Sequence, residues 1–96
     1  MIDLEYKHIE FIKQLIGSIL PNAEIFIYGS RVQELAYKYS DVDIAINNFS
    51  EIPFEDLLKI KAKFRESTFP YKVDIVDLKS LKPNFLELIQ KDLTKI

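Results

Sequence analysis

The chain has no cysteine among its 96 residues. Disulfide bonds and thiolate metal sites are therefore excluded, and so are zinc ribbons and cysteine nucleophiles. The sequence also has no apolar run near the roughly 18 residues that span a bilayer, and it opens without the basic flank and apolar segment of a signal peptide. We therefore expect a cytoplasmic protein that does not enter a membrane.

Neither sign of charge dominates, because 13 Lys and Arg stand against 15 Asp and Glu and the net charge is −2. A general nucleic-acid binder usually carries a basic excess, so direct nucleic-acid binding is not expected. With 48% hydrophobic residues the chain can build a core. Its length predicts a single domain over residues 1–96, of modest stability, to which a partner or ligand could add.

The hydrophobic spacing predicts alternating helices and strands. Spacings of three and four residues predict helices over 3–20 and 53–68, and a third helix begins at Ser80 or Pro83 and runs to 93. Apolar and β-branched runs predict three strands, over 25–28, 41–46 and 71–78, with a short helical turn over 31–37. This order predicts an α/β (α+β) fold in which helices cover a small sheet.

Gly29 and Ser30 stand between the first predicted strand and the helical turn. Glycine allows the backbone to turn sharply, so that amide N–H groups and the Ser30 hydroxyl can face an anion. The pair is suited to binding phosphate, although most Gly-Ser pairs after a strand are simple turns.

Asp41 and Asp43 are two residues apart in a predicted strand, so their carboxylates point to the same face. Two such charges repel unless cations offset them, and hard oxygen ligands suit Mg²⁺. A carboxylate from the third strand would complete a two-metal site for in-line phosphoryl transfer. Asp74 and Asp77 lie on opposite faces of that strand, so at most one of them joins the site, and Asp74 is our candidate.

Together, Gly29-Ser30, Asp41-x-Asp43 and Asp74 resemble the signature of the DNA polymerase β nucleotidyltransferase superfamily. Gly29-Ser30-Arg31 and Ser40-Asp41-Val42-Asp43 are similar to the motifs of its minimal nucleotidyltransferase (MNT) group. The resemblance covers essentially the whole chain and implies a polymerase β-like palm fold with a small mixed β-sheet. Many members carry a glycine where this sequence has Glu34, which leaves the shape of the phosphate loop open.

The resemblance also implies roles for individual residues. Asp41 and Asp43 would hold two Mg²⁺ ions, or Mn²⁺ in their place, and Asp74 would bind the catalytic metal and help to deprotonate the attacking hydroxyl. Gly29 and Ser30 would hold the phosphates of ATP. Two further residues complete the predicted nucleotide-binding set: Arg31, whose side chain would contact phosphate or acceptor or else be solvated, and Ser40, which would orient the Asp41 loop.

The larger enzymes of the superfamily carry an extra acceptor domain, for which this chain has no residues left. MNT proteins pair with a small helical HEPN protein, and the resemblance implies an antitoxin that transfers AMP from ATP to a tyrosine of a HEPN toxin. One alternative is a binding module that neutralises its partner by complex formation, with Glu34 as the hint of a vestigial site. Another is a homodimeric nucleotidyltransferase that acts on a small molecule.

Two further features indicate contacts with other molecules. Tyr37 and Tyr39 lie between the two motifs and could stack on a base, touch a partner or pack within the loop. The last predicted helix is rich in apolar residues, Leu88 and Ile89 among them. Its apolar face is either buried against the sheet or left exposed as a partner surface.

Overall fold

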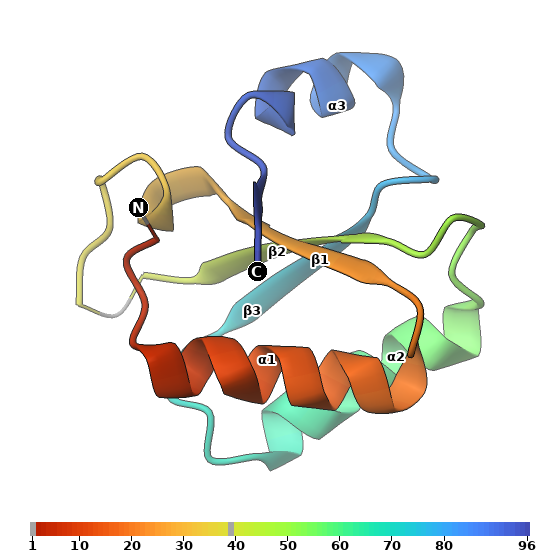
Figure 1. Ribbon diagram of the computed structural model, residues 1–96, viewed down its shortest axis with the longest axis horizontal. Helices are drawn as coiled ribbons and strands as arrows, with labels where there is room; N and C mark the ends of the chain where they lie inside the picture. Colours follow the sequence, from red (N-terminus) through yellow and green to blue (C-terminus); the bar gives the residue numbers. More distant parts are fainter. Residues whose placement is uncertain (1, 39) are drawn as a thin grey trace.

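The computed structural model describes residues 2–38 and 40–96, and within them it forms three α-helices and a four-stranded sheet (Figure 1). In chain order, the elements are α1 (Tyr6–Ile19), β1 (Glu24–Tyr28), the short 3-10 helix η1 (Gly29–Arg31), β2 (Val42–Asn47), α2 (Phe54–Glu66), β3 (Val73–Asp77), α3 (Pro83–Gln90) and β4 (Thr94–Lys95). The predicted α/β (α+β) class is confirmed.

The strands are ordered β3-β2-β1-β4 across the sheet. β1 is antiparallel to both β2 and β4, whereas β2 and β3 are parallel. The sheet is therefore mixed, as the resemblance implied. Parallel neighbours need a long crossover, and α2 is the helix that provides it.

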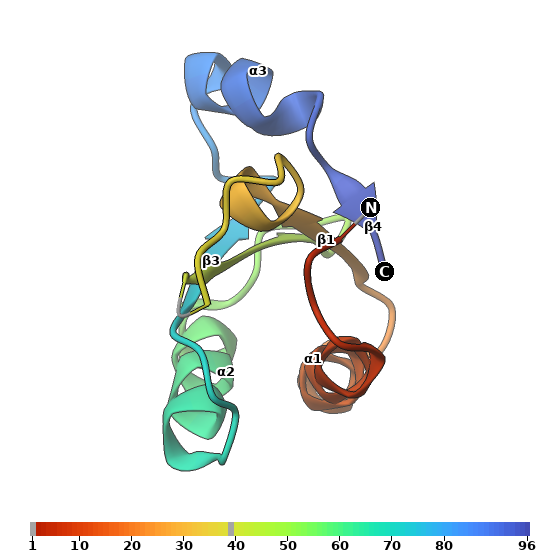
Figure 2. The same cartoon turned by 90° about the vertical axis from the view of Figure 1, so that its left-hand side faces the viewer.

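Helices cover both faces of the sheet. α1 and α2 lie against one face and α3 lies over the other (Figure 2). The larger core fills the space beneath α1 and α2, where the fully buried side chains are Ile12, Ile16, Ile27, Val42, Ile44, Ile46 and Ile60. A smaller cluster, of Tyr28, Ala45 and Ile89, lies on the α3 face.

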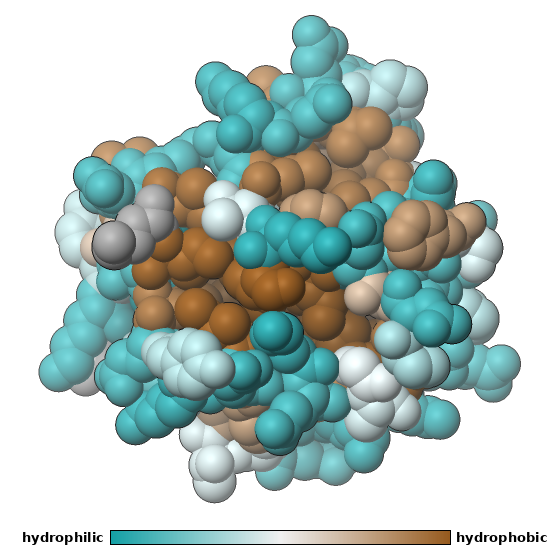
Figure 3. Space-filling model, in the orientation of Figure 1, coloured by the Kyte–Doolittle hydropathy of each residue, from teal (hydrophilic) through white to brown (hydrophobic). Residues whose placement is uncertain are grey.

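The two faces follow from the alternation of side chains along the strands. In β2, Val42, Ile44 and Ile46 join the larger core, while Ala45 joins the smaller one. Asp43, which falls between Val42 and Ile44, is therefore directed to the α3 face. Figure 3 shows apolar atoms along the middle of one side of the molecule, between hydrophilic rims at the levels of α1 and α3.

Helix α3 is neither fully buried nor fully free. Ile89 is buried in the smaller cluster, whereas Leu88 is 69% exposed. The apolar residues of this helix are therefore divided between a buried side and an exposed side, and a partner at the exposed side stays a prediction. Of the two predicted starts, Ser80 and Pro83, the helix begins at Pro83, because proline fits the first turn without losing a hydrogen bond.

Some boundaries differ from the prediction. The expected helical turn over 31–37 is wrong, because η1 covers Gly29–Arg31 and the chain then continues in turns and irregular structure. The last helix ends at Gln90 rather than at 93, and the chain turns to form β4, which was not predicted. A strand of two residues is too short to show an alternating pattern in the sequence. The strand is extended by Ile96, whose N–H donates to the Ile25 carbonyl at 3.0 Å.

Asp77 has a structural position at the end of β3. It is buried, and its carboxylate accepts hydrogen bonds from the N–H of Ile52 at 2.8 Å, the N–H of Lys79 at 3.0 Å and the hydroxyl of Ser80 at 3.0 Å. Asp74 is exposed and is aligned with Asp43 on β2. Of the two candidates in this strand, Asp74 is therefore the one beside the other acidic residues.

Replacing Asp77 with Ala should lower the free energy of unfolding by about 2 kcal/mol or more, because the buried amide of Ile52 loses its acceptor. Asp77→Asn keeps one acceptor oxygen and should fall between this variant and the wild type. The matched control Asp74→Ala should change stability by no more than about 0.5 kcal/mol. Urea denaturation measures all three, and equal losses in Asp77→Ala and Asp74→Ala would contradict this assignment.

Candidate functional site

Three polar side chains form a row across the end of the sheet. Asp43 of β2 is the register partner of Asp74 on β3 and of Tyr28 on β1. Register partners on adjacent strands point to the same face and stand about 5 Å apart. Asp41 lies just before β2 and two residues from Asp43. The structure thus brings the three predicted carboxylates to one end of the sheet, on the face that α3 covers.

Gly29 packs directly against the Asp43 carboxylate. A side chain at position 29 would overlap Asp43 Oδ2 and would stand 3.2 Å from its Cγ. The backbone there also has a φ of 78°, in the left-handed region that glycine adopts without strain. Position 29 therefore needs glycine both for its conformation and for the space it leaves to Asp43.

Ser30 follows within η1 and is half-buried. Its carbonyl accepts the Leu35 N–H at 3.0 Å, and the Gly29 carbonyl accepts the N–H groups of Val32 and Gln33, each at 3.0 Å. These bonds close the turn after β1 into a compact loop beside Asp43. The phosphate-binding role of Gly29 and Ser30 stays a prediction.

The acidic residues repel one another electrostatically. Burial raises the pKa of the Asp43 carboxyl above its usual range, and the carboxylates of Asp74 and Asp41 raise it further. Burial, with Asp43 and Asp74 nearby, also raises the pKa of Tyr28 to about 12. Tyr28 is therefore uncharged at neutral pH. The negative charges near Asp43 repel its carboxylate, and a bound cation would reduce this repulsion.

The donor set fits a hard, hydrated cation. Within the described ranges 2–38 and 40–96, no three acidic or histidine side chains are gathered closely enough to hold a metal ion by themselves. Mg²⁺ does not require such a cage, because it usually keeps several waters and takes one or two carboxylates together with substrate phosphates. Asp41, Asp43 and Asp74 supply only oxygen donors, as this kind of site needs.

Arg31 is neither solvated nor directed at the acidic residues. It is buried, and its terminal nitrogens donate to the backbone carbonyls of Asp3 and Ser40, both at 2.8 Å. Its guanidinium lies 4.2 Å from the centre of the Tyr71 ring. The expectation of a solvated Arg31 is wrong, and this side chain instead holds the residue next to Asp41 in place.

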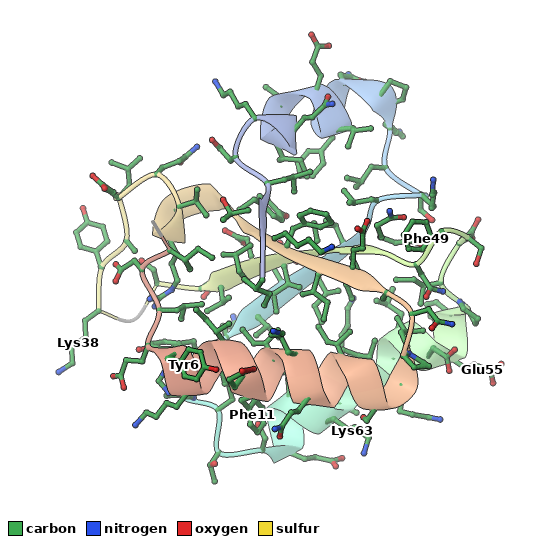
Figure 4. All side chains as sticks on the ribbon, viewed as in Figure 1. Tyr6, Phe11, Lys38, Phe49, Glu55 and Lys63 are labelled. Atoms are coloured by element: carbon green, nitrogen blue, oxygen red, sulfur yellow. The ribbon has the colours of Figure 1, made fainter. Side chains whose placement is uncertain are left out.

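The hydroxyl of Ser40 has the orienting contact that the sequence suggested. It accepts the backbone N–H of Tyr37 at 2.7 Å, while the Ser40 N–H donates to the Tyr37 carbonyl at 3.0 Å. Tyr37 itself is 84% exposed, and Lys38 lies at the outer end of the same loop (Figure 4). Tyr39 lies outside the described residues.

Glu34 occupies a glycine-like backbone conformation. Its φ is 61°, so the position where many MNT proteins have glycine keeps a left-handed backbone in this chain. A non-glycine residue in this region carries strain. The loop therefore keeps the shape that glycine would favour, and Glu34 is no sign of a different loop.

Two residues of this region were not found from the sequence. Tyr28 could have been recognised, because strand alternation from Ile27 and its position before Gly29 direct it toward Asp43. Tyr71 carries no such signal, since its contact with Arg31 joins residues that are distant in the sequence and depends on the loops being in place.

A mixed sheet with Gly-Ser at the end of one strand and Asp-x-Asp at the start of the next is the arrangement that the resemblance to nucleotidyltransferases implied. Residues 5–96 match the family described as polymerase beta, nucleotidyltransferase. The chain belongs to this family. Among the residues that the structure describes, there is no helix with the length and apolar character to cross a membrane.

The chain is also similar to individual proteins. It is 31% identical over 90 residues to a probable protein adenylyltransferase MntA of Haemophilus influenzae, covering 94% of this chain and 79% of that protein. Its fold is similar to a toxin–antitoxin crystal structure with AMP-PNP, at a TM-score of 0.75 and 22% identity, covering 96% of this chain and 72% of the other.

A third similarity is to a tri-AMPylated Shewanella oneidensis HEPN toxin in complex with an MNT antitoxin. The matched chain has a TM-score of 0.73 and 20% identity, with 96% of this chain and 71% of the other covered. Together with the family match, these similarities support the MNT resemblance seen in the motifs.

Asp43→Asn should raise the free energy of unfolding at pH 7 by about 0.5 kcal/mol, the size of a like-charge pair across strands. A carboxyl whose pKa is raised on folding favours the folded state below its unfolded pKa, and this contribution is lost as pH rises through the folded value. The gain should therefore vanish at about pH 4 and below. Urea denaturation in EDTA tests this, and a variant less stable than wild type at pH 7 would contradict it.

Glu34→Gly should stabilise the fold by about 1 kcal/mol, because the left-handed backbone costs a non-glycine residue roughly that much. The same substitution at Glu51, which is exposed and has an ordinary φ, should instead destabilise by about 0.5–1 kcal/mol. Thermal denaturation compares the two variants. A loss of stability in both would show that position 34 is not strained.

Proposed function

We propose that this chain is a Mg²⁺-dependent nucleotidyltransferase that transfers AMP from ATP to a tyrosine of a HEPN-type protein and so acts as an antitoxin. The observation that carries the proposal is the alignment of Asp43 with Asp74 across β2 and β3, with Gly29 packed against Asp43. The similar proteins support it. One is a probable protein adenylyltransferase, one is a toxin–antitoxin structure with an ATP analogue, and one contains a HEPN toxin modified with AMP.

Each residue has a proposed task. Asp41, Asp43 and Asp74 would hold two Mg²⁺ ions, or Mn²⁺, which when bound supply positive charge to offset that of the phosphates. Gly29 and Ser30 would receive the β- and γ-phosphates at the turn after β1. Arg31 and Ser40 also belong to the predicted nucleotide-binding set. They would act as positioning residues that hold the loop before Asp41, without contacting the nucleotide themselves.

The proposed chemistry is a single displacement. The hydroxyl oxygen of the acceptor tyrosine attacks the α-phosphorus of ATP, the bond to the β-phosphate oxygen breaks, and pyrophosphate leaves. The hydroxyl proton passes to the carboxylate of Asp74, which is exposed and able to release it to water. The product is a phosphodiester that joins the tyrosine oxygen to the 5′-oxygen of adenosine.

Residues 1–96 would act as one nucleotidyltransferase domain, and the reaction would take place in the cytoplasm, where ATP and Mg²⁺ are supplied. The sequence hint of a vestigial site rested on Glu34, and this residue keeps the glycine-like conformation of the loop.

Incubating the chain with a HEPN-type partner, ATP and Mg²⁺ should add one or more AMP groups to the partner, as read by intact mass. Asp41→Asn with Asp43→Asn should slow the transfer by on the order of a hundredfold or more. Glu51→Gln with Glu55→Gln removes the same charge at exposed positions before and in the first turn of α2, and should leave the rate unchanged.

A partner that binds the wild-type chain but keeps its mass would contradict the proposed transfer. If the Asp41→Asn, Asp43→Asn variant also neutralised that partner, the protein would act as a binding module instead. Modification of a small molecule with no change in the partner would favour the remaining alternative.

A further inference from the structure

A groove of about 490 Å³ lies between the second half of α2 and the segment that leads into β3. Three cationic side chains border it, Lys61 and Arg65 on α2 and Lys72 just before β3. Three aromatic rings, of Phe64, Phe69 and Tyr71, form its apolar part. We call this the cationic groove.

The charge of the cationic groove is uncompensated. No acidic side chain borders it, and none of the ion pairs found among residues 2–38 and 40–96 involves Lys61, Arg65 or Lys72. All three residues are exposed. The net charge of the chain is −2, so a local cluster of three positive charges is a departure from the overall balance. Such a cluster attracts a ligand with negative charge.

The aromatic part of the groove is held by packing. The Phe69 ring lies 5.4 Å from that of Phe64 and 5.8 Å from that of Tyr71, measured between centroids and in edge-to-face geometry. Tyr71 is fixed in turn by the guanidinium of Arg31. The groove is therefore preformed, with an apolar surface that suits aliphatic or aromatic side chains.

One end of the groove lies at the same end of the sheet as the acidic residues. The carbonyl of Lys72 accepts the Val42 N–H at 2.9 Å, which joins the groove to the residue beside Asp41. Figure 2 shows the segment before β3 rising past α2 toward the loop that precedes β2. A chain segment bound in the groove would pass around the end of the sheet at Lys72 to reach the carboxylates on the α3 face.

We propose that the cationic groove binds an acidic segment of the protein acceptor, one that carries apolar side chains beside its Asp or Glu residues, and so holds the acceptor tyrosine near Asp41 and Asp74. This rests on the proposed function. A short acidic peptide is favoured over nucleic acid because its few carboxylates match the three cations of the groove, whereas a strand of regularly spaced phosphates would extend beyond them toward Asp41 and Asp74.

The test is a binding measurement without ATP. The probe is a short fluorescein-labelled peptide of Glu and Leu, compared with a peptide in which Gln replaces Glu. Fluorescence anisotropy should show binding of the Glu peptide to the wild-type chain, and Lys61→Glu with Arg65→Glu should weaken it at least tenfold. Lys59→Glu with Lys63→Glu makes the same charge change on other positions of α2, with Lys63 near Phe11 on the α1 side (Figure 4), and should weaken it less than threefold.

The site is overturned if the two charge-reversal variants weaken binding equally, if the wild-type chain does not bind the Glu peptide, or if the Gln peptide binds as tightly. It is also overturned if an RNA oligonucleotide of equal charge binds more tightly and displaces the peptide. Each double variant should unfold at the same urea concentration as the wild type, so that a loss of binding is not a loss of fold.

A second readout separates this inference from the proposed function. With the HEPN-type partner, ATP and Mg²⁺, Lys61→Glu with Arg65→Glu should raise the KM for the partner at least tenfold and leave the KM for ATP unchanged. A wild-type chain that binds the Glu peptide but transfers no AMP would refute the proposed function alone. Transfer in which both variants keep the wild-type KM for the partner would refute the groove alone.

Discussion

Carboxylates that repel one another lie at one end of the sheet, and the rest of the structure must offset the free energy that this repulsion costs. Asp43 faces Asp74 across a parallel strand pair, and burial makes its charge still less favourable. The opposite face of the same strands offsets this cost, because Val42, Ile44 and Ile46 are completely buried beneath α1 and α2. A cation bound beside these carboxylates would offset their repulsion.

The loop contacts around the carboxylates all help to position Asp41 and Asp43. Gly29 gives Asp43 its space, Arg31 fixes the Ser40 carbonyl, and the Ser40 hydroxyl closes the turn at Tyr37. None of these contacts touches more than one carboxylate, yet together they determine where Asp41 begins the strand. Positioning of this kind matters for phosphoryl transfer because the reaction depends on alignment more than on covalent chemistry.

The sequence predicted the elements that have a strong period and the residues that carry a motif. Residues 3–20 and 53–68 contain helices, because apolar spacing is a local property. Asp41, Asp43 and Asp74 lie at the same end of the sheet, and here the motif indicated the non-local partner Asp74. The buried position of Arg31 and the strand at Thr94 could not be predicted. Both depend on partners far along the chain, Asp3 and Tyr71 for the first and β1 for the second.

The parallel pairing of β2 with β3 also bears on how the protein folds. Asp43 and Asp74 lie on opposite sides of a complete helix in the sequence, so their alignment needs the closure of a long loop and the packing of α2. Parallel pairing across such a separation belongs to the contacts that form slowly in folding. Hydrogen exchange at the Val42 amide, which bonds to Lys72, would report directly on the opening of this strand pair in the native state.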